Sequence, residues 1–225
     1  MRLLVTGAGG FVGSRLVAEL APRHEVFAVA RRPGPAIDGV VWIALDLARP
    51  LDPARLPAGV DSVVHLAQSR RYRDFPDGAA DVFAVNVAST VALLEYARHA
   101  GVRSFVFTSS GGVYGFSYER FVEEDPVNPL NFYFGSKYSA ELLIGNYGTL
   151  FHTVVLRPFF VYGAGQQGML VPNLVERVLT DTEITIEGNR ACESIRSTSP
   201  TLCVPSSRRS RSTGRACSTS PATRC

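Results

Sequence analysis

The residues best suited to chemistry in this chain are Tyr133 and Lys137, which stand one helical turn apart. Lys137 is the only lysine, and every other side chain counted as Lys or Arg is an arginine. A nearby ammonium favours the phenolate and lowers the pKa of a tyrosine, so the tyrosine can exchange protons with a hydroxyl near neutral pH. Lysine suits this purpose better than arginine because its charge is compact. The pair predicts acid–base catalysis on an alcohol or carbonyl; the alternative for this spacing by itself is a solvated helix face.

The N-terminal segment has the pattern of a dinucleotide-binding turn. Residues 2–6 form a short apolar run that predicts a buried strand. Gly7, Gly10 and Gly13 follow at intervals of three, and apolar residues then recur at helical spacing up to Leu20. In such units the glycines permit a tight turn, close approach of the backbone to a pyrophosphate, and close helix–strand packing. The free amides of the helix N-terminus are predicted to face the phosphates.

Strand and helix patterns alternate along the rest of the chain. Strands are predicted over residues 25–30, 40–45, 61–66, 102–108 and 153–156, and helices over about 79–100, 132–147 and 169–179. Most of the predicted strands are continuous apolar runs, which is typical of strands covered by helices on both faces. The alternation predicts an α/β fold, a doubly wound parallel Rossmann sheet.

Seven motifs together resemble those of the extended short-chain dehydrogenases/reductases, the group of the NAD-dependent epimerases/dehydratases. They are Thr6-Gly-Ala-Gly-Gly-Phe-Val-Gly13, Asp46-Leu47, His65-Leu66-Ala67, Asn86-Val87, Thr108-Ser109-Ser110-Gly-Gly-Val-Tyr-Gly115, Tyr133-x-x-Ser136-Lys137 and Leu156-Arg157-Pro158. The motifs come in the family's order and cover residues 1 to about 190. The resemblance is specific because of this order and number, whereas each motif alone is modest.

The resemblance implies a role for each matching residue. Catalysis would fall to Ser110, which bonds the substrate oxygen, to Tyr133 as the acid/base, and to Lys137, which lowers the pKa of Tyr133 and holds the nicotinamide ribose. The cofactor-binding residues would be Gly7, Gly10, Phe11, Val12, Gly13, Asp46, Leu47, Leu66, Ala67, Asn86, Tyr133, Lys137 and Pro158. Ser110 and Asp46 have an alternative role as ordinary cap or turn residues. No metal site is expected, since no second side chain shows a ligand spacing with His65.

Arg31 and Arg32 bear on the choice between NAD and NADP. Family members that prefer NAD often end the second strand with an acidic residue, whereas this strand ends in Val-Ala-Arg31-Arg32. An arginine at this place accommodates the 2′-phosphate of NADP. The sequence therefore leans to NADP, with Arg31 as a cofactor residue. The alternative is NAD, with both arginines stacked over adenine or facing water.

Two further departures concern the substrate. Phe159 and Phe160 follow the sixth strand, where many nucleotide-sugar enzymes of the family carry asparagine. Asn131 and Phe132 precede Tyr133, where dehydratases carry an acidic pair, so dehydration is disfavoured. We expect an NAD(P)-dependent epimerase or oxidoreductase that interconverts alcohol and carbonyl on a sugar-type substrate, with nucleotide sugars among the candidates. The alternatives are a non-sugar carbonyl reductase or alcohol dehydrogenase, and a catalytically idle NAD(P)-binding or redox-sensing module.

Residues 191–225 differ sharply in composition from the rest. They hold nine Ser, five Thr, six Arg and all four cysteines, with one acidic and no aromatic residue. Nucleic-acid binding, metal binding by cysteines without a close pair, an ordinary disordered tail and a shifted reading frame compete as explanations. We favour the shifted frame. Residues 191–198, read one base earlier with suitable synonymous codons, spell Gly-Leu-Arg-Ile-Asn-Pro-Ile-Tyr-Val, which resembles the family's crossing from the substrate lobe to the cofactor lobe.

The expected organisation follows from these patterns. Residues 1–165 would form the NAD(P)-binding Rossmann domain, residues 166–190 the start of a truncated substrate lobe, and residues 191–225 an aberrant, disordered tail. The surfaces that pack on a lost lobe would be exposed, so we expect reduced solubility and weak or absent turnover even if the cofactor binds. The net charge of +3 comes from the tail, since residues 1–190 keep 17 of the 23 Lys and Arg and 19 of the 20 acidic residues.

The remaining expectations concern partners and location. We expect a small-molecule substrate and no nucleic-acid partner. No membrane association is expected, because no apolar run approaches spanning length. The absence of a signal peptide and the lack of cysteine before residue 191 predict a cytoplasmic protein. The family resemblance also implies a homodimer, for which residues 82–97 offer a helical surface.

Overall fold

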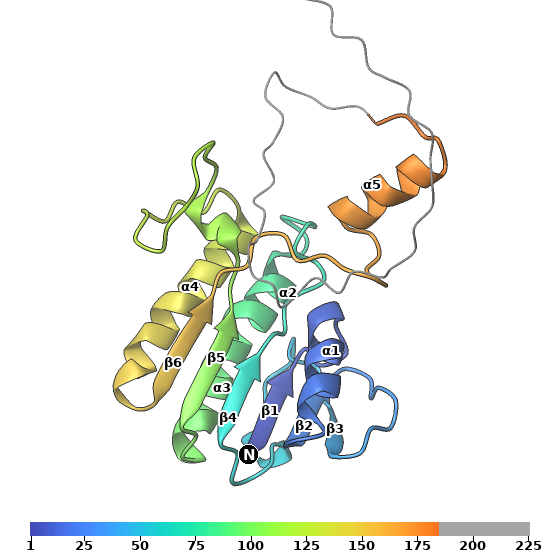
Figure 1. Cartoon of the computed structure of the whole chain (residues 1–225). Helices are drawn as coiled ribbons and strands as arrows, with labels where there is room; N and C mark the ends of the chain where they lie inside the picture. Colours follow the sequence, from blue (N-terminus) through green and yellow to red (C-terminus); the bar gives the residue numbers. More distant parts are fainter. Residues whose placement is uncertain (185–225) are drawn as a thin grey trace, which may run out of the picture. The chain divides into compact units, whose positions relative to one another are not determined.

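Six parallel strands form one sheet in the order β3-β2-β1-β4-β5-β6 (Figure 1). The strands are β1 (Arg2–Thr6), β2 (Glu25–Ala30), β3 (Val40–Ala44), β4 (Ser62–His65), β5 (Ser104–Thr108) and β6 (His152–Leu156). The computed structural model describes residues 1–184. The predicted doubly wound parallel sheet is confirmed. The strand order reverses between β1 and β4, which is where open α/β sheets bind their ligands.

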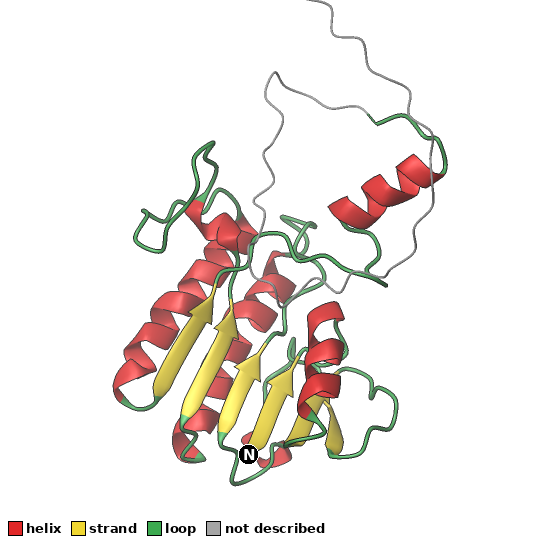
Figure 2. Ribbon diagram, viewed as in Figure 1, coloured by secondary structure: helices red, strands yellow, loops and turns green. Residues whose placement is uncertain are grey.

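Helices connect the strands and cover the sheet (Figure 2). They are α1 (Phe11–Leu20), α2 (Ala79–Phe83), α3 (Ser89–His99), α4 (Phe132–Asn146) and α5 (Leu170–Leu179), with short helical turns η1 (Pro53–Arg55), η2 (Ala84–Ala88), η3 (Gly111–Tyr114) and η4 (Tyr147–Thr149). The single helix predicted over residues 79–100 consists of α2, η2 and α3. Its middle part, η2, is a π-helical turn that contains Asn86. Turns of this kind are rare inside helices and occur often at functional sites.

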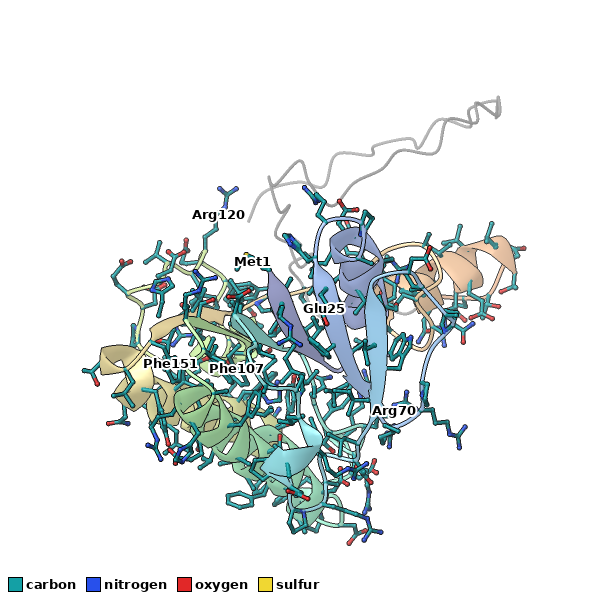
Figure 3. The ribbon with its side chains drawn as sticks, turned by 90° about the horizontal axis from the view of Figure 1, so that it is seen from below. Met1, Glu25, Arg70, Phe107, Arg120 and Phe151 are labelled. Carbon is teal, nitrogen blue, oxygen red and sulfur yellow. The ribbon has the colours of Figure 1, made fainter. Side chains whose placement is uncertain are left out.

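Apolar side chains alternate between the two faces of the sheet, because successive strand residues point in opposite directions. On β1, Leu4 belongs to the larger core cluster, which α3 and α4 complete. The next residue, Val5, belongs to a smaller cluster with Val17 of α1. Figure 1 shows α1 on one face and α3 and α4 on the other. Figure 3 shows two members of the larger cluster, Phe107 and Phe151, among the side chains between the sheet and its helices.

The expected burial of both faces holds for β1 and β2 but not for β5 and β6. In β5 the buried Phe105 and Phe107 alternate with residues that are only half-buried. No residue of β6 is fully buried. The reason is that α1 packs mainly on β1 and β2, so one face of β5 and β6 is incompletely covered within residues 1–184. The same region includes the amphipathic α5, in which no residue is buried. The sequence analysis predicts exposed apolar surface at the places where a substrate lobe would pack.

The continuous helical run Ala79–His99 is long and apolar enough to cross a membrane, judged by length and composition alone. The expectation that no apolar run approaches that length is therefore wrong by this measure. In the structure this run is a core helix. Leu93, Leu94 and Ala97 are fully buried in the larger cluster. Of the most apolar 18-residue stretch of this run, 44% is buried inside the protein.

A buried histidine joins β1, β4 and the π-helical turn. His65 Nδ1 lies 2.6 Å from Thr6 Oγ1, and His65 Nε2 lies 3.0 Å from Thr90 Oγ1. Thr90 Oγ1 donates its one proton to the carbonyl of Asn86, so Nε2 must be the donor to Thr90. Nδ1 is then the acceptor for Thr6, whose oxygen also accepts from Ala67 N. Every polar group of this network is satisfied only while His65 is neutral.

Acid should weaken the fold through His65. Burial, and secondly the charge of Lys137, lower the pKa of His65 from 6.5 to about 3. The unfolded chain therefore binds the extra proton first as pH falls from 6.5 towards 3, and stability is lost over that window. We expect His65→Gln to reduce the pH dependence of the free energy of unfolding by up to about 1.4 kcal/mol per pH unit. Urea unfolding between pH 7 and pH 4 measures this slope.

The exposed His152→Gln serves as the matched control and should leave the slope unchanged. An unchanged slope in His65→Gln itself would contradict the account of the network.

Candidate active site

The glycine-rich turn between β1 and α1 has no room for side chains. Gly7 has a positive φ of 69°, and a Cβ atom there would lie 2.7 Å from the backbone nitrogen of Ala67. A Cβ atom at Gly13 would lie 2.2 Å from the carbonyl oxygen of Gly7. Gly10 N donates to the same oxygen at 2.9 Å and precedes the first turn of α1. The tight turn and the close helix–strand packing predicted for these glycines are therefore present in the structure.

A cavity of about 960 Å³ lies beyond the carboxyl ends of β1, β2 and β4. Eight of the residues predicted to bind cofactor line it: Gly7, Gly10, Phe11, Arg31, Asp46, Leu47, Leu66 and Ala67. Gly9, Arg32, Gln68, Ser69, Arg70 and Tyr72, which the sequence analysis did not assign to the cofactor site, line it as well. The structure thus brings together residues from three separate motifs, and Arg31 at the end of β2, at one edge of the sheet.

Six other predicted cofactor residues do not line this cavity: Val12, Gly13, Asn86, Tyr133, Lys137 and Pro158. Gly13 packs α1 on β1, and Val12 is exposed on α1. Asn86 is fully buried and donates from Nδ2 to Ser136 Oγ at 2.9 Å. The carbonyl of Pro158 accepts from Gly111 N at 2.8 Å, which ties the segment after β6 to the segment after β5.

Two predicted residues also make local turn contacts. Asp46 Oδ1 accepts from Ala48 N at 3.1 Å while the residue lines the cavity. Ser110 caps η3, because its Oγ accepts from Gly112 N at 3.2 Å. The cap role that the sequence left open for Ser110 is therefore present. In the described part of the chain no hydrogen bond joins Ser110 to Tyr133.

Tyr133 lies in the first turn of α4, which begins after Asn131. The side chain of Asn131 caps the helix by accepting from Phe134 N at 2.9 Å. The phenol of Tyr133 donates to Gln68 Oε1 at 2.8 Å. Its ring also packs on the ring of Tyr72, with centroids 5.2 Å apart. The loop after β4 therefore contacts the tyrosine through Gln68 and Tyr72, and this loop also lines the cavity.

Lys137 is buried one turn further along α4. Its Nζ donates to the carbonyl of Thr108 at 2.9 Å and lies 4.9 Å from the ring centroid of Phe107. Burial lowers the pKa of Lys137 from 10.5 to about 7, and Glu141 opposes this shift. Near pH 7 the amine therefore exists in both protonation states.

The predicted lowering of the tyrosine pKa is wrong for this structure. Burial, and secondly Tyr72, raise the pKa of Tyr133 to about 12. Lys137 does not offset this, because its own burial disfavours its charge and its ammonium is directed to the Thr108 carbonyl. The two residues stand one helical turn apart, as the sequence predicts. Burial nevertheless raises the pKa of Tyr133, where the sequence predicts a lowered pKa.

An ion pair behind the site holds α4 against β6. Arg157 Nη2 lies 2.6 Å from Glu141 Oε2, and the Glu141 side chain is only 6% exposed. Arg157 also stacks over the ring of Tyr114 at 4.7 Å. Removing one partner of such a buried pair leaves the other charge uncompensated, which is strongly destabilising. The Leu-Arg-Pro motif therefore contributes to the position of the helix that carries Tyr133 and Lys137.

The residues that sequence reasoning missed are mainly Gln68 and Tyr72. Both belong to the loop that follows β4, and both line the cavity and contact Tyr133. Their place directly after β4 could have indicated them, because ligand sites in open parallel sheets lie beyond the carboxyl ends of strands. Neither residue belongs to a motif, so the contact with Tyr133 follows only from the packing of this loop on α4.

The parallel sheet, the glycine-rich turn and the cavity at its switch point define a Rossmann-type dinucleotide-binding fold. The sequence model of the NAD dependent epimerase/dehydratase family matches residues 3–193, and the chain belongs to this family. The predicted resemblance is thereby confirmed.

Relatives in this family have different reactions. The chain is 31% identical over 208 residues to an uncharacterized UDP-glucose epimerase of Bacillus subtilis, covering 84% of this chain and 66% of that protein. It is 32% identical over 187 residues to a 3-beta-hydroxysteroid dehydrogenase of Mycolicibacterium neoaurum, covering 75% and 50%. A UDP-glucuronic acid 4-epimerase of Bacillus cereus, solved with NAD, superimposes with a TM-score of 0.73 at 28% identity, covering 84% and 66%. The chain thus spans between half and two thirds of these relatives.

Burial of Lys137 should cost stability near neutral pH. The unfolded chain binds this proton more readily between pH 7 and pH 10.5, so stability should rise with pH over that window. We expect Lys137→Met to raise the free energy of unfolding at pH 7 by on the order of 1 kcal/mol. Lys137→Arg should lower it, because arginine stays charged. Urea unfolding at pH 7 and pH 9 tests both variants, and the opposite ranking would contradict the burial of a titrating amine.

Proposed function

We propose that this chain forms the cofactor-binding and proton-transferring part of an NAD(P)-dependent enzyme that interconverts an alcohol and a carbonyl on a sugar-type substrate. The observation that carries the proposal is the position of Tyr133, whose phenol meets the loop that lines the dinucleotide-type cavity. A tyrosine placed there lies beside the place where a nicotinamide cofactor binds in this fold class. The family's epimerases and dehydrogenases support the same reaction class.

The residues present fit a nicotinamide dinucleotide. Gly7, Gly9 and Gly10 line the cavity without side chains, so a pyrophosphate can approach the backbone there. The cavity volume of about 960 Å³ lies in the range of small-molecule and cofactor sites. Asp46, Leu47 and Arg31 would hold the adenosine end, and Leu66 and Ala67 would lie along the cofactor. When bound, the cofactor supplies the acceptor and donor of hydride.

The chain's own groups would move the proton. Tyr133 would remove the proton of the substrate hydroxyl and return it in the reverse direction. Ser110 would turn from its cap on η3 to hydrogen-bond the substrate oxygen, which costs only a single bond to Gly112 N. Lys137 titrates near pH 7, so it can carry positive charge when an anionic phenolate forms nearby. This assignment gives each of the three residues a distinct task.

Replacing Tyr133 separates catalysis from binding. We expect Tyr133→Phe to lower kcat by about 10²-fold or more, because a general acid–base group contributes that much. The affinity for NAD⁺ and NADP⁺ should stay within a factor of about three, since the ring is kept. Turnover of UDP-glucose and cofactor titration by calorimetry measure the two quantities. Tyr138→Phe, on the same helix, is the control.

Unchanged turnover in Tyr133→Phe would end the assignment of Tyr133. Cofactor binding with no turnover in the unsubstituted chain would instead favour a catalytically idle binding module.

Arg31 and Arg32 lead us to propose NADP as the preferred cofactor. Both line the cavity at the end of β2, where an arginine accommodates a 2′-phosphate. We expect tighter binding of NADP⁺ than of NAD⁺, and about tenfold loss of that preference in Arg31→Ser/Arg32→Ser. Calorimetric titration of both cofactors measures it. Equal or tighter binding of NAD⁺ would overturn the preference and agree with the solved relatives, which hold NAD.

A non-sugar substrate is the second candidate function. The similarity to a hydroxysteroid dehydrogenase supports it. Phe159 and Phe160 support it as well, because they are exposed after β6 at the place where an asparagine would suit a nucleotide sugar. Comparing turnover of UDP-glucose with oxidation of a 3β-hydroxysteroid decides between the two classes.

Location and assembly are also proposals. We infer a cytoplasmic protein that acts on a small molecule and forms a homodimer. Within residues 82–97 most apolar side chains, such as Leu93 and Leu94, face the core. Phe83 is 55% exposed and is the apolar residue this surface offers to a second copy.

A further inference from the structure

A chain of hydrogen bonds connects the phenol of Tyr133, by way of the neighbouring residues Gln68 and Ser69, with the backbone carbonyl of Tyr133 itself. Its phenol donates to Gln68 Oε1 at 2.8 Å. The next residue, Ser69, donates from its backbone nitrogen to Asn86 Oδ1 at 3.0 Å. Asn86 Nδ2 donates to Ser136 Oγ at 2.9 Å, and Ser136 Oγ donates to the carbonyl of Tyr133 at 2.7 Å. One buried asparagine therefore holds the backbone beside Gln68 and, through Ser136, the backbone of the tyrosine.

The backbone around Gln68 is anchored on both sides. Before it, Ala67 N donates to Thr6 Oγ1 at 3.3 Å. After it, Ser69 Oγ donates to a carboxylate oxygen of Asp81 and accepts from Arg71 N at 3.0 Å. Ala67 and Ser69 are buried, whereas the side chain between them is exposed at the cavity. The fold thus presents the Gln68 amide to Tyr133 from a fixed backbone while leaving the amide itself free to turn.

Two aromatic side chains also pack against the ring of Tyr133. Tyr72 packs against it at 5.2 Å between centroids, and Phe134 lies at 5.3 Å. These contacts restrict where the phenol oxygen can lie, so the same Gln68 amide stays within reach when the tyrosine gains or loses its proton.

From this geometry we propose that Gln68 is a positioning residue that serves both protonation states of Tyr133. Its Oε1 accepts the proton of the neutral phenol, as the structure shows. After proton transfer the amide turns about its last torsion, and Nε2 donates to the phenolate oxygen. The proposal deepens the proposed function, on which it rests, by adding a residue that steadies the acid/base through its cycle.

The chemistry of the side chain explains why an amide suits this place. A primary amide carries both an acceptor oxygen and two N–H donors, and its terminal torsion is broad and roughly two-fold. A glutamate could accept from the phenol but would repel the phenolate. A leucine could do neither. In the described part of the chain Nε2 of Gln68 has no other hydrogen-bond partner, so turning the amide breaks no further bond.

The test is a titration of Tyr133 alone. The chain is produced with 3,5-difluorotyrosine at position 133, because fluorination brings the phenol's titration into a range where the protein stays folded. The ¹⁹F NMR signal then reports the pKa of this one residue in the unsubstituted chain, in Gln68→Leu and in Gln68→Glu. Gln167→Leu, at an exposed position outside the site, is the matched control.

The proposal fixes the sign of each change. Gln68→Leu should raise the pKa by about one unit, because the bond to the charged phenolate is the stronger of the two that are lost. Gln68→Glu should raise it further through repulsion, and Gln167→Leu should leave it unchanged. A fall in Gln68→Leu would mean that Gln68 only accepts. No change in either Gln68 variant would mean that it is a bystander. Either result overturns the proposal.

The titration needs neither cofactor nor turnover, so its result can contradict the role of Gln68 without contradicting the proposed function. Loss of the proposed reaction in Tyr133→Phe, together with an unchanged titration in the Gln68 variants, would keep the function and remove the role of Gln68. Circular dichroism and urea unfolding of each variant check that the fold is kept. If Gln68→Leu does not fold, Gln68→Met supplies the same test with a side chain of similar length.

Discussion

The burial of one amine, that of Lys137, is the constraint on which the rest of the site depends. An ammonium placed between a sheet and a helix is expensive, and here the Thr108 carbonyl and the face of Phe107 receive it. The contact requires α4 to lie close to the end of β5. Gly112 allows this approach, since a Cβ atom there would lie 2.1 Å from the ring of Phe134. The pKa of Lys137 falls to about 7 as a result.

A polar network beneath the cavity supplies the rigidity that this arrangement needs. His65, held neutral between two threonines, connects the ends of β1 and β4 to the π-helical turn. Asn86 in that turn continues the connection to α4 through Ser136. Because the network is satisfied in one protonation state only, it favours a single arrangement of the strand ends. The end of β1 next to the glycine-rich turn and the helix α4 are thus joined by one hydrogen-bonded framework.

Sequence reasoning succeeded where the pattern is local. The strands, the glycine spacing and the place of Tyr133 on a helix follow from apolar periodicity and from residues close together in the chain. It failed where distant segments meet. Gln68 carries no motif, and its contact with Tyr133 spans 65 residues. The direction of the Tyr133 pKa shift also could not be read from the Tyr–Lys spacing, because it is set by burial and secondly by Tyr72.

The most direct measurement of the central claim uses the fact that the chain has one lysine. Protein labelled with ¹³Cε-lysine gives a single side-chain signal, which needs no assignment and can be followed by NMR from pH 6 to pH 11. The account predicts a midpoint near 7, as burial between β5 and α4 requires. A midpoint near the ordinary lysine value of about 10.4 would show that the amine is solvated, and would contradict the constraint from which the geometry of the site follows.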